Sequence, residues 1–186
     1  LETPDEKLSR SISVLLELVE RDAHGRHGFD WGLKAFSDNA GALVLLPHLT
    51  ALAERTGRWS ELVRTLEQGG NGLNRPAVAL ELGRIYLDIM GRPERAVDIL
   101  RDASEAAPDD LELLKQYLKA LNVAGLHVEK AKLLSQRLQR TWDDSDARDL
   151  TARLARAHDA IDQPTQAIEA WRHHLSYGRP AADCLE

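Results

Sequence analysis

The chain of 186 residues has one cysteine, few aromatic residues and no long apolar segment. Cys184 has no second cysteine to pair with, so no internal disulfide framework holds the fold. The longest apolar run, Ala42 to Pro47, is far shorter than the roughly 20 residues of a membrane-spanning helix. We therefore expect no membrane span, and the thiol content is compatible with the cytoplasmic location that we expect.

The chain also lacks an excess of positive charge. It carries 24 Lys and Arg against 30 Asp and Glu, a formal net charge of −6. A protein that neutralises many phosphates needs surplus cations, so general nucleic-acid binding is disfavoured, although a local basic patch is not. The hydrophobic content of 43% is typical of a folded chain.

Signatures of catalysis are missing as well. The sequence contains no nucleophile elbow, phosphate-binding loop or paired metal motif, so we predict no catalytic residue, no cofactor and no enzyme activity. His24 and His27 lie in a glycine-rich linker without a cysteine, and the adjacent His173 and His174 point to different helix faces. We therefore predict no metal site.

What the chain does have is a period of about 34 residues. Turn residues recur five or six positions before a small or aliphatic residue, at Gly57, Gly91, Gly125 and Asp162. A period of this length indicates stacked helical hairpins. Apolar periodicity, breakers and start signals predict ten helices in five hairpins: Asp5–Arg21 with Phe29–Phe36, Gly41–Arg55 with Trp59–Glu67, Arg75–Met90 with Pro93–Ala106, Asp110–Ala124 with Val128–Arg140, and Asp144–Asp159 with Pro164–His174.

The third hairpin carries a specific pattern. Leu82-Gly83 and Tyr86 on its first helix precede Ala96, Leu100 and Ala103 on its second, and Pro108 closes the unit. This pattern resembles the tetratricopeptide repeat, in which small residues sit where the two helices cross. The other hairpins match in phase but more weakly, and the first is the weakest.

The resemblance implies an all-α, right-handed superhelical α-solenoid of about five antiparallel hairpins. We expect a degenerate first hairpin over residues 1–38, repeats over 39–178 and a tail over 179–186. It also implies a protein–protein interaction scaffold. Since the chain starts at Leu1, we expect it to be a segment of a larger protein that docks a partner peptide or domain.

In this family the first helix of each hairpin lines the concave groove, which carries the partner. The exposed groove positions fall here on a mostly basic set: His48, Arg84, Lys115, Lys119, Asn122, Arg153 and Arg156. Like charges so close on a helix cost a few tenths of a kcal/mol, which favours an acidic partner for this groove. The alternative is a solvated face balanced by Glu81 and Asp159. Lys119 and Arg153 stand where a chaperone-binding carboxylate clamp would have Asn, so chaperone binding is not inferred.

Two other functions stay open. The ends or convex face of a solenoid can assemble with copies of the chain, and helical hairpins of similar length bind RNA in the pentatricopeptide family. Of the four tryptophans, Trp31, Trp59 and Trp171 are expected in packing contacts. Trp142, beside Asp143 and Asp144, is a contact candidate if it is exposed.

Overall fold

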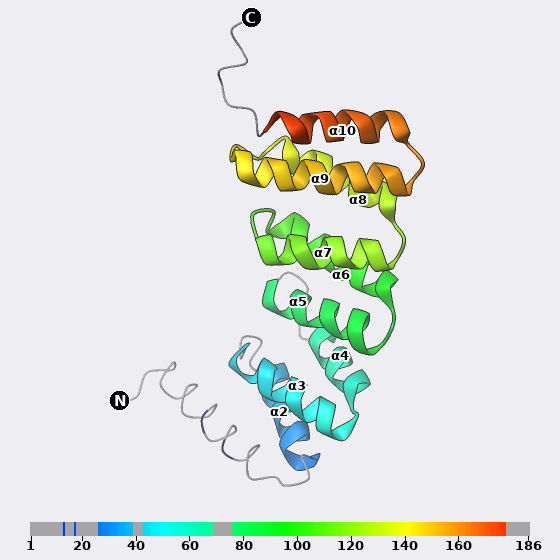
Figure 1. Cartoon of the computed structure of the whole chain (residues 1–186). Helices are drawn as coiled ribbons and strands as arrows, with labels where there is room; N and C mark the ends of the chain where they lie inside the picture. The colour runs from blue at the N-terminus through cyan, green and yellow to red at the C-terminus, as the bar shows by residue number, and fades with distance from the viewer. Residues whose placement is uncertain (1–12, 14–16, 18–25, 39–42, 69–75, 178–186) are drawn as a thin grey trace, which may run out of the picture. The chain divides into compact units, whose positions relative to one another are not determined.

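The computed structural model describes residues 13, 17, 26–38, 43–68 and 76–177, and these residues form helices and short connections without a strand (Figure 1). The predicted helix Asp5–Arg21 and the predicted tail lie almost entirely outside the described residues. The chain divides into two compact units, Leu1–Tyr117 and Leu118–Glu186.

The N-terminal unit holds antiparallel helices joined by short turns. Helix α2 packs against α3 and α4, and α5 packs against α6. Helix α7 begins in this unit and ends in the next. The bounds are α2 (Arg26–Asp38), the 3₁₀ turn η1 (Leu43–Leu45), α3 (Leu46–Thr56), α4 (Trp59–Gln68), α5 (Pro76–Arg84), the π-helix η3 (Ile85–Ile89), α6 (Pro93–Ala106) and α7 (Leu111–Val123).

The C-terminal unit is a three-helix stack that follows the end of α7. Helix α9 contacts both α8 and α10. Its helices are α8 (His127–Leu138), α9 (Asp144–Ala160) and α10 (Pro164–Ser176). The all-α hairpin fold and most helix bounds agree with the sequence prediction.

The 34-residue period is visible in the backbone. Positive φ angles occur at Gly57 (70°), Gly91 (60°), Gly125 (71°) and Asp162 (54°). Each residue lies in the turn between the two helices of a hairpin. Glycine and, more rarely, aspartate tolerate this left-handed conformation, which explains why these residue types recur there.

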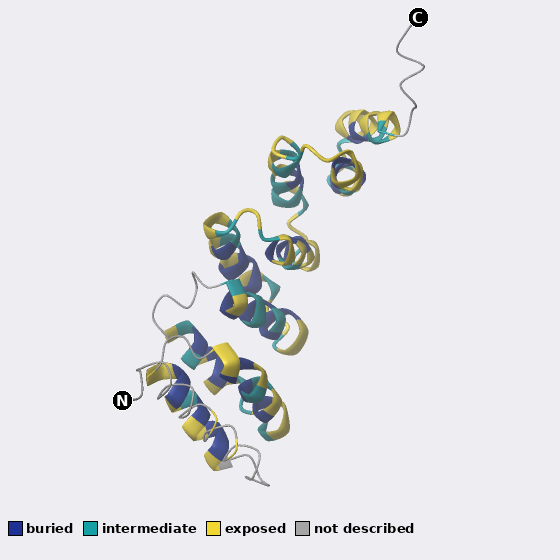
Figure 2. Cartoon of the chain, turned by 90° about the vertical axis from the view of Figure 1, so that its left-hand side faces the viewer, coloured by how far each residue is buried: buried dark blue, intermediate teal, exposed yellow. Residues whose placement is uncertain are grey.

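Buried residues lie mainly on the sides of helices that face their neighbours (Figure 2). The tightest crossing in the third hairpin is at Gly83, where a Cβ atom would lie 2.8 Å from Cδ1 of Leu100. Ala96 and Ala103 on α6 are also buried. Small residues at this crossing let α5 and α6 approach closely, as the sequence pattern predicts.

The predicted helix Arg75–Met90 is not uniform. After Arg84 it widens into the π-helix η3, in which the N–H of Met90 donates to the carbonyl of Ile85 at 2.9 Å. The wider turn buries three consecutive side chains, Ile85, Tyr86 and Leu87. Tyr86 also donates a hydrogen bond to Glu67 on α4 at 2.7 Å. Burial and this carboxylate together raise the pKa of Tyr86.

The glycine-rich linker predicted before Phe29 was wrong at its C-terminal end, because its last residues already belong to helix α2. Helix α2 begins at Arg26 and runs through Gly28 and Gly32. A Cβ atom on Gly32 would lie 2.7 Å from Cδ2 of Leu49 on α3. Glycine here allows a close helix contact, and packing against α3 outweighs its low helix propensity.

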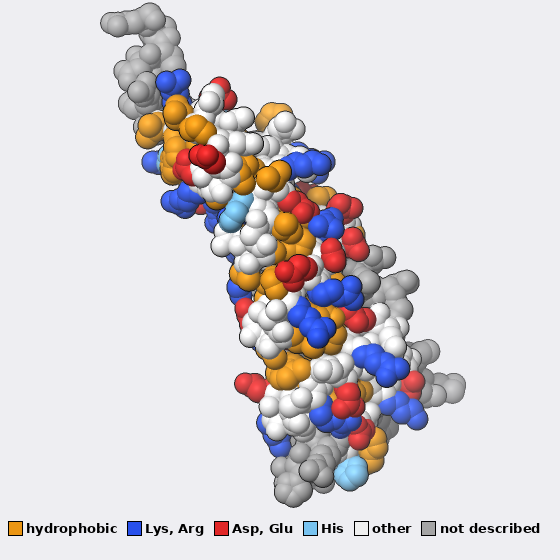
Figure 3. All heavy atoms as spheres, turned by 90° about the vertical axis from the view of Figure 1, so that its right-hand side faces the viewer, with side chains coloured by type: hydrophobic (Ala, Val, Ile, Leu, Met, Phe, Trp, Pro, Cys, Tyr) orange, Lys and Arg blue, Asp and Glu red, His pale blue; other side chains and the backbone are white. Residues whose placement is uncertain are grey.

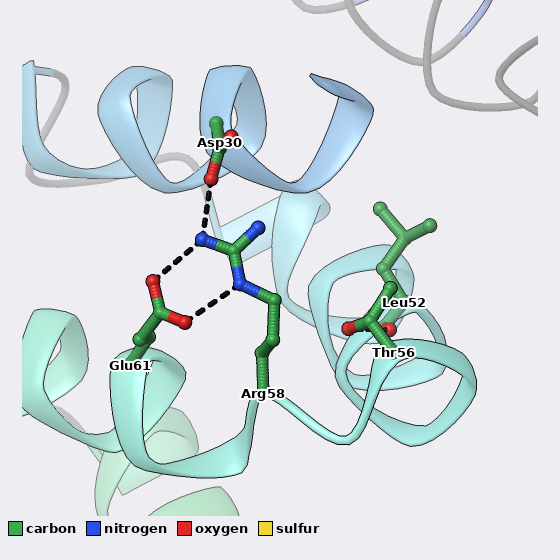
Figure 4. Close-up of polar contacts among 5 residues, drawn as sticks. All are labelled: Asp30, Leu52, Thr56, Arg58 and Glu61. Atoms are coloured by element: carbon green, nitrogen blue, oxygen red, sulfur yellow. Dashed lines mark hydrogen bonds and ion pairs between the residues drawn. The ribbon is translucent and has the colours of Figure 1, made fainter. Parts of the chain in front are cut away.

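Arg58 ties three elements of the N-terminal unit together (Figure 4). From the α3–α4 turn its guanidinium binds Asp30 on α2 at 2.6 Å and both carboxylate oxygens of Glu61 on α4. It also lies over the ring of Phe29, 4.7 Å from the centroid. The bond from Arg58 lowers the pKa of Glu61.

Of the three tryptophans expected in packing contacts, Trp31 departs from the expectation. Trp59 and Trp171 are half-buried, but Trp31 is 50% exposed because it lies on the outer side of α2. Trp142 is 95% exposed in the connection between α8 and α9. Its expected role as a contact candidate therefore stays a prediction.

Candidate functional site

The predicted groove residues fall into both units. His48 on α3, Arg84 on α5 and Lys115 on α7 belong to the N-terminal unit. Lys119 and Asn122 on α7, with Arg153 and Arg156 on α9, belong to the C-terminal unit. Carboxylate partners lie beside Arg84 and Lys115 in the first group and beside Arg153 in the second.

In the N-terminal unit the cations have acidic partners. Nη2 of Arg84 lies 2.6 Å from Glu81, which also accepts a hydrogen bond from Thr50 at 2.9 Å. The bond to Glu81 raises the pKa of Arg84. Lys115 lies 3.5 Å from Glu112. An anionic ligand would have to compete with these carboxylates.

In the C-terminal unit, helix α9 is covered on two sides. Its buried residues face α8 and α10 and are mostly small, which permits close packing. Asp149, Arg153 and Arg156 follow one another at spacings of four and three residues on one side of the helix, where they are exposed or half-buried. The covering helices thus direct both arginines to the same side.

Helix α8 adds a cation that the sequence analysis did not select. Nζ of Lys130 donates a hydrogen bond to Oδ1 of Asn122 at 2.8 Å. The α7–α8 turn at Gly125 brings these residues together across eight positions. Lys130 is half-buried, and the positive charges of Arg153 and Arg156 act on it.

The charge balance around Lys130 is positive. Burial, followed by repulsion from Arg153 and Arg156, lowers the pKa of Lys130. Among the described residues, Lys130 forms no ion pair, and its hydrogen-bond partner is the neutral amide of Asn122. Asp149 binds Nε of Arg153 at 2.8 Å and offsets part of this charge.

We call the accessible surface of Lys119, Asn122, Lys130, Arg153 and Arg156 the basic face. Lys119 and Asn122 lie three positions apart on the same side of α7, and both are exposed. Acidic and basic side chains are interspersed on the side of the chain that Figure 3 shows.

A metal site needs a group of ligand side chains, and a membrane span needs a long apolar helix. Over the part of the chain that the structure describes, no three His, Cys, Asp or Glu side chains are grouped so as to hold a metal ion. Within the same residues, none of the helices is long and apolar enough to cross a membrane. His24 and Cys184 lie outside the described residues.

Residues 79–114 match the family model of the tetratricopeptide repeat. They contain the buried pattern of Leu82, Gly83, Tyr86, Ala96 and Leu100 at the α5–α6 crossing. The chain contains a tetratricopeptide repeat. A search of curated proteins found no significant match in sequence.

Solved structures of tetratricopeptide-type repeats are similar to the chain. One contains nearly identical TPR-like repeats from a kinesin light chain candidate of Podosopora anserina, with 18% identity, full coverage of both chains and a TM-score of 0.55. A single-substitution variant of that protein gives 19% identity, coverage of 94% of this chain and 95% of the other, and a TM-score of 0.53. A thermophilic TPR protein of Thermus thermophilus gives 15% identity, coverage of 95% and 94%, and a TM-score of 0.44.

The tetratricopeptide repeat fold generally serves protein–protein interaction. It supports partner contacts through side chains on a rigid stack of helices. The family pattern predicts groove residues on the first helix of each hairpin, and therefore did not select Lys130, which lies on a second helix, α8. The predicted turn at Gly125 indicates only that residues before and after it lie on neighbouring helix ends; the contact of Lys130 with Asn122 is a feature of the folded structure.

Proposed function

We propose that this chain is a protein-interaction scaffold whose C-terminal unit docks an acidic segment of a partner on the basic face. The observation that carries the proposal is the pair formed by Lys130 and Asn122 beside two arginines of α9. A half-buried cation without a carboxylate partner among the described residues has unused capacity for an anionic ligand. The function is binding, and no catalytic step is assigned.

Arginine and lysine have different parts in this proposal. A guanidinium offers a planar pair of donors that matches a carboxylate, whereas an ammonium acts as a compact charge with three donors. Arg156 is exposed and forms no ion pair with the residues that the structure describes. It is therefore the residue expected to meet an acidic side chain or chain terminus first, with Lys130 deeper in the face.

The test is binding of a fluorescein-labelled hexaglutamate peptide, measured by anisotropy at low salt. The variant Lys119→Glu/Arg156→Glu reverses two charges of the basic face. A matched control, Lys132→Glu/Arg148→Glu, reverses one exposed cation on α8 and one on α9 outside it. We expect the first variant to abolish binding and the control to retain most of it.

Two results would contradict the proposal. Unchanged affinity in Lys119→Glu/Arg156→Glu would remove the basic face from the interaction. Equal losses in both variants would show that only the total charge matters, because long-range electrostatic forces depend on net charge rather than on the position of a residue.

A further inference from the structure

The part of the basic face around Lys130 has an unusual local balance of charge. We call Asn122, Lys130, Arg153 and Arg156 the Lys130 cluster. The cluster contains three cations: Lys130, Arg153 and Arg156. Among the described residues, one carboxylate forms an ion pair with them, that of Asp149. Three positive charges and one negative charge leave a net charge of about +2. A phosphate monoester carries about −1.5 to −2 near pH 7, so the two charges are close to balanced.

The donors in this cluster are only partly used. An ammonium group has three hydrogens, and Lys130 gives one of them to Asn122. Asp149 binds Nε of Arg153, which leaves the two terminal guanidinium nitrogens without a partner among the described residues. The guanidinium of Arg156 likewise has no such partner. Several donors on three side chains are thus available to one ligand.

Two of these side chains already have a partner within the chain. Nζ of Lys130 donates to Oδ1 of Asn122, and Nε of Arg153 forms an ion pair with Asp149. Less side-chain freedom is then lost when a ligand binds. Other charged groups on the same helices include Lys119 on α7, Glu129 on α8 and Asp159 on α9. Asp159 accepts a hydrogen bond from Nε1 of Trp171 at 3.4 Å.

We propose that the Lys130 cluster receives a phosphorylated serine or threonine of the partner. This inference rests on the proposed function, because it names the anionic group that the basic face selects. A phosphate monoester brings three acceptor oxygens and a charge of about −1.5 to −2, whereas a carboxylate brings two oxygens and one charge. The donors of Lys130, Arg153 and Arg156 suit the larger anion.

The test uses three labelled acidic peptides that differ only at one central residue: serine, glutamate or phosphoserine. We expect the phosphoserine peptide to bind about tenfold more tightly than the glutamate peptide, because one to three additional charge-assisted hydrogen bonds form. Lys130→Gln and Arg156→Gln should each remove this preference. Lys132→Gln, which removes an exposed lysine on the same helix, should keep it. Circular dichroism checks that each variant is folded.

The outcomes separate this inference from the proposed function. If the three peptides bind equally and Lys119→Glu/Arg156→Glu abolishes their binding, the phosphate site is refuted and the acidic-partner function stands. A phosphoserine preference that survives in both glutamine variants also refutes the site, because the anion would be bound elsewhere. If no peptide binds, both proposals fail.

A second readout does not depend on peptide affinity. The side chain of Lys130 is followed by its ¹³Cε chemical shift in a pH titration with and without the phosphoserine peptide. A bound phosphate stabilises the ammonium form, so the pKa of Lys130 should rise when the peptide binds. An unchanged titration at saturating peptide would contradict the proposed contact.

Discussion

Nζ of Lys130 lies 2.8 Å from Oδ1 of Asn122, although the two residues belong to different helices and are eight positions apart. This bond places a half-buried ammonium next to an amide that cannot neutralise it. Arg153 and Arg156 add further positive charge from α9. The proposed binding of an anionic partner depends on this relationship.

The lowered pKa of Lys130 has a consequence for stability. Its folded-state pKa is below the ordinary value of 10.5, so between the two values the unfolded chain binds more protons. The contribution of Lys130 to the free energy of unfolding should therefore rise with pH through that window. Urea denaturation of the wild type and Lys130→Met across this pH range checks it. A difference that stays constant or falls with pH would contradict the sign, and Lys132→Met is the comparison on the same helix.

Gly83 should tolerate no side chain. Its added Cβ would lie 2.8 Å from Cδ1 and 3.0 Å from Cδ2 of Leu100. We expect Gly83→Ala to lower the free energy of unfolding by about 1–3 kcal/mol, the usual cost of overpacking a core. In Gly83→Ala/Leu100→Val the shorter side chain makes room, so the combined loss should be smaller than the sum of the single losses. Additive losses in denaturant unfolding would rule out this contact as the cause.

Asp143 should stabilise the start of α9. Its Oδ1 accepts hydrogen bonds from the N–H groups of Ser145 at 2.9 Å and Asp146 at 3.0 Å. Replacing such an N-cap by alanine typically costs about 1 kcal/mol. Asp143→Ala should therefore lower the free energy of unfolding by that amount, and Asp144→Ala, which removes a neighbouring exposed carboxylate, by less. Equal effects in thermal or urea unfolding would exclude the cap.

Trp142 should contribute little to stability. At 95% exposure it has almost no packing to lose, so Trp142→Ala should change the free energy of unfolding by less than about 0.5 kcal/mol. Trp171→Ala, at a half-buried position, should cost more. Iodide should quench a fluorescence component that Trp142→Phe lacks. A large loss of stability in Trp142→Ala would contradict the exposed position.

Much of the fold could be read from local signals. Pro93 and Pro164 each begin a helix where predicted, because proline is tolerated in the first turn. Gly57, predicted as a turn residue, ends α3 in the left-handed conformation that glycine adopts most easily. Such features are encoded by single residues and their neighbours, so periodicity and turn chemistry find them.

Other features depend on tertiary contacts. The π-helix at Ile85–Ile89 follows from packing, and no residue type in that stretch predicts it. Gly28 was predicted to lie in a linker, yet it lies inside α2, and Gly32 in the same helix makes room for Leu49. Lys130 becomes notable only when the turn places it beside Asn122, with α9 alongside. The family pattern located four residues of the basic face but not this one.

Binding of an acidic ligand to the basic face of the C-terminal unit is tested most directly by chemical-shift mapping. The ¹⁵N-labelled protein is titrated with hexaglutamate at low salt and followed by ¹H–¹⁵N spectra. We expect saturable shifts at the amides of Lys119, Asn122 and Lys130 and at the side-chain Nε of Arg153 and Arg156. Shifts confined to α3 and α5, or none at saturating peptide, would contradict the proposed function.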